Sequence, residues 1–196
     1  GLMRFNGTNG GYVLAGIGSP RTTLKNKIEA LPAYGGTPLT ETLWEAYLYI
    51  SGGNLSFAKN VSKRLRDTSI EIDHGSHYSY ISPFDNPDEV KRCDNSVNII
   101  YMTDGDPSAG YDNQRDRNLK ALYYSSFRSA LYESNKIAGV YLHKLAEIIH
   151  GTDDTKVDLF RSTPDIHETG RVYTIGFGSG MSYNGKRLLK ETARLG

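Results

Sequence analysis

The chain of 196 residues lacks several features that mark whole classes of proteins. Its one cysteine, Cys93, cannot form an internal disulfide and has no companions for a structural zinc site. We expect this thiol to be a small packed residue, or half of a bridge to polypeptide outside these residues. No apolar run approaches the roughly 18 residues of a membrane-spanning helix, which excludes a transmembrane segment within the sequence.

An excess of charge of one sign is also lacking. The 23 lysines and arginines nearly balance the 22 acidic residues, for a formal net charge of +1. Such a balance gives no indication of a nucleic-acid or anionic-membrane partner. No signal peptide is recognisable, and the apolar start Gly1–Phe5 is typical of the middle of a domain, so we expect a fragment or a processed chain.

Hydrophobic residues make up 38% of the chain, and its 21 glycines bring the apolar share to the usual globular level. In the first part, turn residues separate short apolar and helical segments. The second predicted helix has Thr37 as its N-cap and Pro38 at its first position. The elements predicted before residue 54 are two strands of a hairpin and two helices: Gly1–Phe5, Tyr12–Ile17, Thr22–Leu31 and a helix from Pro38 to Gly52.

The stretch from about residue 54 to about residue 94 is mixed and polar and contains tyrosines, and Pro83 and Pro87 interrupt it. We predict a loop-rich insertion there, long enough to serve a surface or binding role. The rest of the chain predicts strands and helices in alternation, with a charged loop at Asp112–Asn118. The elements are a strand at Val97–Met102, a largely helical stretch at Leu119–Ile149 with its best part at Ile137–Ile149, a strand at Arg171–Phe177 and a helix at Asn184–Leu195.

This alternation favours an α/β fold, a mostly parallel sheet with helices on both faces, spanning residues 1–196. Ligands of such sheets collect at the carboxyl ends of the strands. Two predicted loops there carry Thr37 and Asp104, whose hydroxyl and carboxylate oxygens suit Mg²⁺ or Mn²⁺. Two plainer interpretations stay open: Thr37 as a helix cap and Asp104 as a turn residue.

Two other patterns point to phosphate chemistry. Asp104-Gly105-Asp106 after a strand resembles the D-x-D motif of haloacid-dehalogenase-type phosphotransferases, in which Asp104 would attack phosphorus and Asp106 would act as general acid. Asp153-Asp154 could serve as the late acidic pair of such an enzyme. Gly180–Arg187 fits most of a phosphate-binding loop, but Arg187 stands where Ser or Thr should hold the metal, so we interpret it as a strand–helix connection.

Three segments in order resemble a von Willebrand factor A domain: Gly35–Leu43, Asn98–Pro107 and Tyr173–Gly178. More narrowly, they resemble the N-terminal domain of the PilY family of type IV pilus tip-associated adhesins. The resemblance covers nearly the whole chain, with residues 54–94 matching least. It implies a Rossmann-like fold and a non-enzymatic adhesion module outside the cell, at a bacterial surface or pilus tip. The implied partners are pilin-like subunits and a host-cell or abiotic surface.

The resemblance also implies a metal-ion-dependent adhesion site holding Mg²⁺ or Mn²⁺, with its threonine at Thr37 and its second-loop aspartate at Asp104. These are the residues already selected for their chemistry. The family's first motif, D-x-S-x-S, and its strand are missing, and the last strand is missing too. We therefore expect an incomplete fold with half of a cation site. A metal-free structural domain of the pilus tip is the remaining interpretation.

Overall fold

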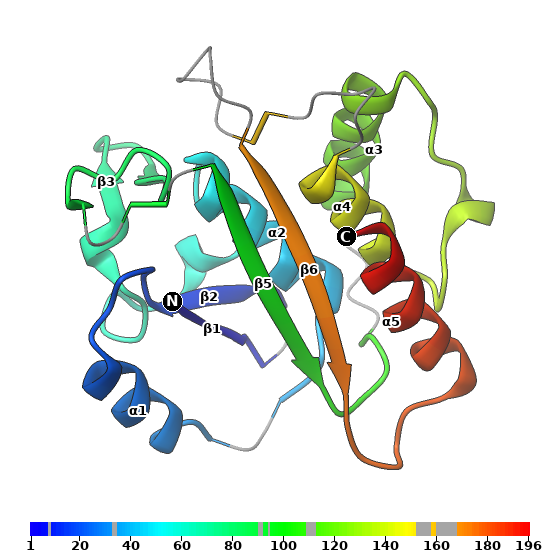
Figure 1. Ribbon diagram of the computed structural model, residues 1–196, viewed down its shortest axis with the longest axis horizontal. Coiled ribbons are helices and arrows are strands. Elements are labelled where there is room, and N and C mark those ends of the chain that lie inside the picture. The colour runs from blue at the N-terminus through cyan, green and yellow to red at the C-terminus, as the bar shows by residue number, and fades with distance from the viewer. Residues whose placement is uncertain are drawn as a thin grey trace. The chain divides into compact units, whose positions relative to one another are not determined.

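The computed structural model describes residues 1–7, 9–32, 35–89, 92–93, 95–108, 113–151, 158–159 and 168–196, without the side chains of residues 113 and 114. These residues form a mixed α/β structure with five α-helices and six strands (Figure 1). The chain divides into two compact units, one formed mainly by the residues before Asn95 and the other by the residues from Asn95 onward. Each unit is described by itself.

The first unit begins with the predicted hairpin. Strands β1 (Leu2–Phe5) and β2 (Gly11–Ala15) pair antiparallel, with Phe5 opposite Gly11. The backbone N–H of Asn6 donates to the carbonyl of Gly10 over 2.8 Å and closes the turn. Every residue of β2 is buried, so this strand is part of the hydrophobic core of the first unit.

Helix α1 (Arg21–Glu29) follows, and then helix α2 (Leu39–Ser51), which packs on β2. No residue of α1 is buried, whereas α2 is buried along most of its length. Helix α2 ends as predicted at Gly52, whose φ of 67° is left-handed and suits a residue without a side chain.

The buried carboxylate of Glu45 ties α2 to the segment that follows it. It accepts hydrogen bonds from the backbone N–H of Phe57 over 2.7 Å, from that of Ser56 over 3.2 Å and from the hydroxyl of Tyr80 over 2.8 Å. Burial raises the pKa of Glu45, and these three donors oppose the rise. One helix side chain therefore positions both ends of a loop-rich stretch.

Residues 54–89 hold only short elements: two 3₁₀ turns and a small antiparallel hairpin of β3 (Glu71–Asp73) and β4 (Tyr78–Tyr80). Leu55, Ile70 and Tyr80 pack in one cluster with Val13 of β2. The guanidinium of Arg66 binds the carboxylate of Glu71 through two hydrogen bonds, of 2.6 and 3.1 Å. The stretch is loop-rich, as predicted, and it contributes to the core. Cys93 beyond it is half-buried and is not part of a disulfide.

We expect Glu71→Gln to destabilise the first unit by about 3–5 kcal/mol, because both side chains of this pair are only 4% exposed and Arg66 would keep an uncompensated charge. Urea unfolding followed by the fluorescence of the single tryptophan, Trp44, measures this effect. Lys25→Ala, which breaks the exposed pair with Glu29, is the control and should change little. Equal effects of the two substitutions would contradict the prediction.

The second unit is built on a parallel pair of strands, β5 (Ser96–Thr103) and β6 (Thr169–Gly176). Their eight residues pair without a shift, from Ser96 opposite Thr169 to Thr103 opposite Gly176. The predicted parallel arrangement is therefore confirmed for β5 and β6. The extended parallel sheet is not shown: the described strands form three two-stranded sheets, because no described strand joins the hairpin to β5.

Three helices accompany this pair: α3 (Asn113–Phe127), α4 (Leu142–His150) and α5 (Tyr183–Leu195). Helices α4 and α5 pack on each other and on β6. The predicted loop at Asp112–Asn118 is wrong from Asn113 onward, because these charged residues are compatible with an exposed helix. The predicted helix at Ile137–Ile149 begins only at Leu142, because Ala138 and Gly139 form a left-handed turn with φ of 49° and 78°.

His143 of α4 lies in the core of this unit. Its side chain is 4% exposed, and its Nδ1 has no hydrogen-bond partner among the described residues. Burial lowers the pKa of His143 to about 4. The unfolded chain therefore takes up this proton first as the pH falls, and stability is lost between about pH 6.5 and about pH 4.

We predict that His143 makes the folded chain about 2 kcal/mol less stable at pH 5 than at pH 7. Urea unfolding followed by circular dichroism at both pH values, in the native chain and in His143→Gln, isolates this contribution. The loss between pH 7 and pH 5 should be smaller in the variant by that amount. An identical loss in both proteins would show that His143 is not the group responsible.

Candidate functional site

The loop before α2 is held by close backbone contact with the β1–β2 turn. The N–H of Gly36 donates to the carbonyl of Gly7 over 2.8 Å. Gly35 has a φ of 122°, and a Cβ there would lie 2.9 Å from the Cα of Gly7. Only glycine fits this approach, so the two glycines position the residue that follows them, Thr37.

Thr37 does not have the predicted role of helix cap. Helix α2 begins at Leu39, Pro38 occupies the cap position, and no side-chain hydrogen bond caps the helix. The carbonyl of Thr37 accepts the N–H of Leu39 over 2.8 Å, and that of Pro38 accepts the N–H of Thr42 over 3.0 Å. Thr37 is half-buried and lies one residue before the cap position.

The first turn of α2 is both polar and buried. Thr40, Glu41 and Thr42 are each no more than 4% exposed. The hydroxyl oxygens of Thr40 and Thr42 have no hydrogen-bond partner among the described residues. Because buried hydroxyls normally form hydrogen bonds, this turn is suited to bind a further polar group.

The second predicted loop follows β5. Thr103 is buried, and its Oγ1 accepts the N–H of Gly105 over 3.3 Å in a tight turn. Asp104, inside that turn, is exposed. The N–H of Phe177 donates to the carbonyl of Thr103 over 3.0 Å, which places the loop after β6 beside Asp104. Asp104 thus lies at the carboxyl end of a parallel strand pair, as expected.

Asp106 has a different role from Asp104. Its Oδ1 accepts the backbone N–H of Ser182 over 3.0 Å, and the Oγ of Ser182 accepts the N–H of Gly185 over 3.1 Å. A carboxylate and a hydroxyl therefore occupy the N-terminus of α5, where negative charge is favourable. We call this arrangement the Asp106 latch. It explains Gly180–Arg187 as a strand–helix connection, with a carboxylate where a phosphate loop would bind phosphate.

The Asp106 latch also constrains Gly185, since a Cβ at that position would overlap Asp106 Oδ1. We predict that Gly185→Ala destabilises the chain by about 1–3 kcal/mol, although alanine normally stabilises a helix relative to glycine by about 0.5–1 kcal/mol. The added Cβ would also lie 2.8 Å from the Cγ of Met181, a close contact that a change of rotamer in this flexible side chain can relieve.

A double-mutant cycle tests this cause. In the Asp106→Ala background, Gly185→Ala should become neutral or stabilising, measured as the free energy of unfolding in urea. The same destabilisation in both backgrounds would show that Asp106 is not what the added methyl group meets.

Beside the Asp106 latch lies a pocket of about 270 Å³ between the end of β6 and α5. Phe177, Met181 and Leu189 form its apolar wall, and Lys186 is the charged residue among those that line it. Met181 and Lys186 belong to the Gly180–Arg187 pattern that we interpreted as a strand–helix connection. Phe177 and Leu189 gave no signal of a site, because apolar side chains on a strand and on a helix look like core positions until their packing is known.

The described residues contain no group of three or more His, Cys, Asp or Glu side chains that could hold a metal ion. Thr37 belongs to the first unit and Asp104 to the second, and the structure does not place one unit against the other. Asp153-Asp154, the acidic pair considered for a phosphotransferase, lies outside the described residues. The structure therefore provides two oxygen donors, each in a defined local setting.

Comparison with protein-family models, with curated proteins and with solved structures found no match. Among the helices of the described residues, none has the length and apolarity to cross a membrane.

Proposed function

We propose that this chain is a binding module, a von Willebrand A-type adhesion domain of a type IV pilus tip-associated protein. It acts outside the cell, at a bacterial surface or pilus tip, and makes or breaks no covalent bond. The order of the three motifs described above supports this proposal. So does the parallel pair β5–β6, with Asp104 at its carboxyl end.

The observation that carries the proposal is that the side chains of two neighbouring aspartates, Asp104 and Asp106, are in different environments. Asp106 is engaged with the backbone of Ser182, whereas Asp104 is exposed at the strand end. A phosphotransferase needs both carboxylates directed at one phosphate, as nucleophile and as general acid. Binding of a cation needs only the exposed carboxylate of Asp104. The arrangement thus favours recognition over catalysis.

Thr37 and Asp104 have the right chemistry for Mg²⁺ or Mn²⁺, which prefer oxygen ligands. Pro38 and not Thr37 occupies the cap position, and among the described residues the buried hydroxyls of the adjacent turn of α2 have no hydrogen-bond partner, so this turn is suited to a polar ligand. A cation held by these two residues keeps coordination positions open. An acidic group of a partner would occupy one of them.

The proposed partners are pilin-like subunits and a host-cell or abiotic surface. The exposed tip of the β3–β4 hairpin is suited to such contacts: Ile72 is 44% exposed, and the rings of His74 and His77 stack with their centroids 4.7 Å apart. The hairpin is anchored at its base by the Arg66–Glu71 pair, so the tip is presented on a fixed support.

We expect Asp104→Asn and Thr37→Val each to weaken Mg²⁺ or Mn²⁺ binding by about tenfold or more, because the first substitution removes the negative charge of a ligand and the second removes a hydroxyl oxygen. Isothermal titration calorimetry on the full chain measures the affinity, and Mn²⁺ electron paramagnetic resonance gives a second readout. Thr37→Ser keeps the hydroxyl and should retain affinity, as should Asp85→Asn at an exposed site. Unchanged affinity in Asp104→Asn would overturn the metal assignment.

Two further measurements separate the alternatives. Steady release of phosphate from a generic ester, lost in Asp104→Asn, would favour the phosphotransferase. Stability and surface adhesion that are independent of added cation would favour a metal-free structural domain.

A further inference from the structure

The β3–β4 hairpin ends in a tight turn flanked by two histidines. His74 and His77 stand opposite each other, on either side of the two-residue turn Gly75-Ser76. The N–H of His74 donates to the carbonyl of His77 over 3.0 Å, and Gly75 has a left-handed φ of 78°, as such turns require. Residues opposite each other in a hairpin direct their side chains to the same face. We call His74 and His77 the histidine pair.

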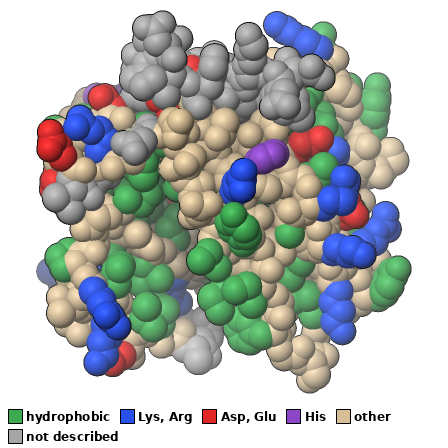
Figure 2. All heavy atoms as spheres, viewed as in Figure 1, with side chains coloured by type: hydrophobic (Ala, Val, Ile, Leu, Met, Phe, Trp, Pro, Cys, Tyr) green, Lys and Arg blue, Asp and Glu red, His purple; other side chains and the backbone are tan. Residues whose placement is uncertain are grey.

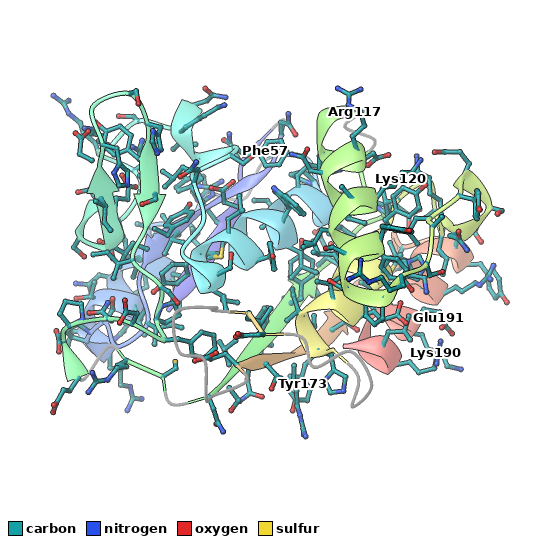
Figure 3. The ribbon with its side chains drawn as sticks, turned by 90° about the horizontal axis from the view of Figure 1, so that it is seen from above. Phe57, Arg117, Lys120, Tyr173, Lys190 and Glu191 are labelled. Carbon is teal, nitrogen blue, oxygen red and sulfur yellow. The ribbon has the colours of Figure 1, made fainter. Side chains whose placement is uncertain are left out.

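The two imidazole rings of the histidine pair lie close together and are accessible. Their centroids are 4.7 Å apart, and their planes are inclined by 18°. Both residues are exposed, and a Cβ at Gly75 would have no heavy atom of the described residues within 4 Å. Figure 2 shows acidic, basic and histidine side chains together over this hairpin, and Figure 3 shows its two strands side by side with side chains on both sides. An ion in solution can therefore reach both rings.

A serine hydroxyl lies on one nitrogen of each ring. Nε2 of His74 is 2.8 Å from the Oγ of Ser79. Nδ1 of His77 is 3.0 Å from the Oγ of Ser76. When each serine accepts the ring N–H, the lone pair of the neutral imidazole is at the other nitrogen, Nδ1 of His74 and Nε2 of His77. Metal-binding histidines are normally oriented in this way, by a hydrogen bond from the second ring nitrogen. The two serines therefore point to a metal ligand.

The carboxylate of Asp73, next to the histidine pair, is not a third ligand. Its Oδ1 accepts the N–H of Gly75 and its Oδ2 accepts the hydroxyl of Tyr78, each over 2.8 Å. These hydrogen bonds hold the pKa of Asp73 below its usual value, so this residue stays charged beside His74. Asp73 and Tyr78 are opposite each other, and strand alternation places their side chains on the other face of the hairpin. The histidine pair thus offers an ion two nitrogen ligands.

The hairpin that carries the histidine pair is held firmly in the first unit. Strand β4 is bonded to β3 on one edge and to the segment before the 3₁₀ turns on the other. The N–H of Leu55 donates to the carbonyl of Tyr78 over 2.9 Å, and the N–H of Tyr80 donates to that of Gly53 over 3.0 Å. A fixed support lowers the entropic cost of bringing two ligands to one ion. All these contacts lie within residues 53–80, so the site does not depend on how the two units are arranged.

We propose that the histidine pair binds Zn²⁺ through Nδ1 of His74 and Nε2 of His77. Imidazole nitrogens suit Zn²⁺, Ni²⁺ and Cu²⁺, whereas Mg²⁺ prefers oxygen. A Zn–N distance of about 2.0–2.1 Å requires the two rings to tilt toward each other from their stack, and exposed side chains have room to do so. Two ligands from the chain leave two tetrahedral positions for water or for a partner's side chain. This site takes a different ion from the proposed site of Thr37 and Asp104 and does not depend on it.

Isothermal titration of the full chain with Zn²⁺, in excess Mg²⁺, tests the proposal. We expect His74→Ala and His77→Ala each to weaken Zn²⁺ binding by about a hundredfold, because the second ligand of a chelate acts at high effective concentration. Ser76→Ala should weaken it by about tenfold, since it removes the hydrogen bond that orients a ligand. His150→Ala, which removes an exposed histidine of α4, is the matched control and should retain the affinity. Asp104→Asn should retain it too, which separates this site from the proposed Mg²⁺ site.

Nuclear magnetic resonance of the imidazole nitrogens tests the site without any substitution. The ¹⁵N shifts should show the protons on Nε2 of His74 and Nδ1 of His77. Added Zn²⁺ should shift the other nitrogen of each ring and leave these protons in place. Three results would overturn the proposal: no measurable Zn²⁺ binding, binding that both histidine substitutions leave unchanged, or Zn²⁺ that shifts no nitrogen of the pair. Each of these would show that the two rings only stack.

Discussion

The parallel pairing of β5 with β6 is the interaction on which the second unit depends. It brings the loop after β5 beside the loop after β6, so that Asp104 and Asp106 lie near the start of α5. It also directs alternate side chains toward α4 and α5 on one side and away from these helices on the other. The position of the proposed ligand and the Asp106 latch both follow from one register.

In the first unit, buried polar groups hold the loop-rich stretch in place. Glu45 and the Arg66–Glu71 pair fix a stretch that is poor in regular structure, and each is satisfied by several hydrogen bonds. Buried polar groups are costly unless they are paired, so these contacts specify one arrangement of the loops. The β3–β4 tip can then be exposed without being loosely attached.

Local pattern was sufficient for much of the fold. The hairpin, the end of α2 at Gly52, and the strands β5 and β6 all follow from short-range turn chemistry and apolar runs. Prediction failed at Asn113, where charged residues form an exposed helix, and at Ala138, where an apolar helical pattern contains a left-handed turn. In both places, hydrophobic periodicity was a poor guide to backbone conformation.

The sequence by itself determined most of the elements, the α/β class and the choice of Thr37 and Asp104 as oxygen donors, because these depend on residue type and on neighbours a few positions away. Only the tertiary structure decided that Asp106 accepts a hydrogen bond at the start of α5 and that the loop before α2 is held by Gly7. Each of these depends on groups far apart in the chain, Asp106 with Ser182 and Gly7 with Gly36, whose meeting no local spacing encodes.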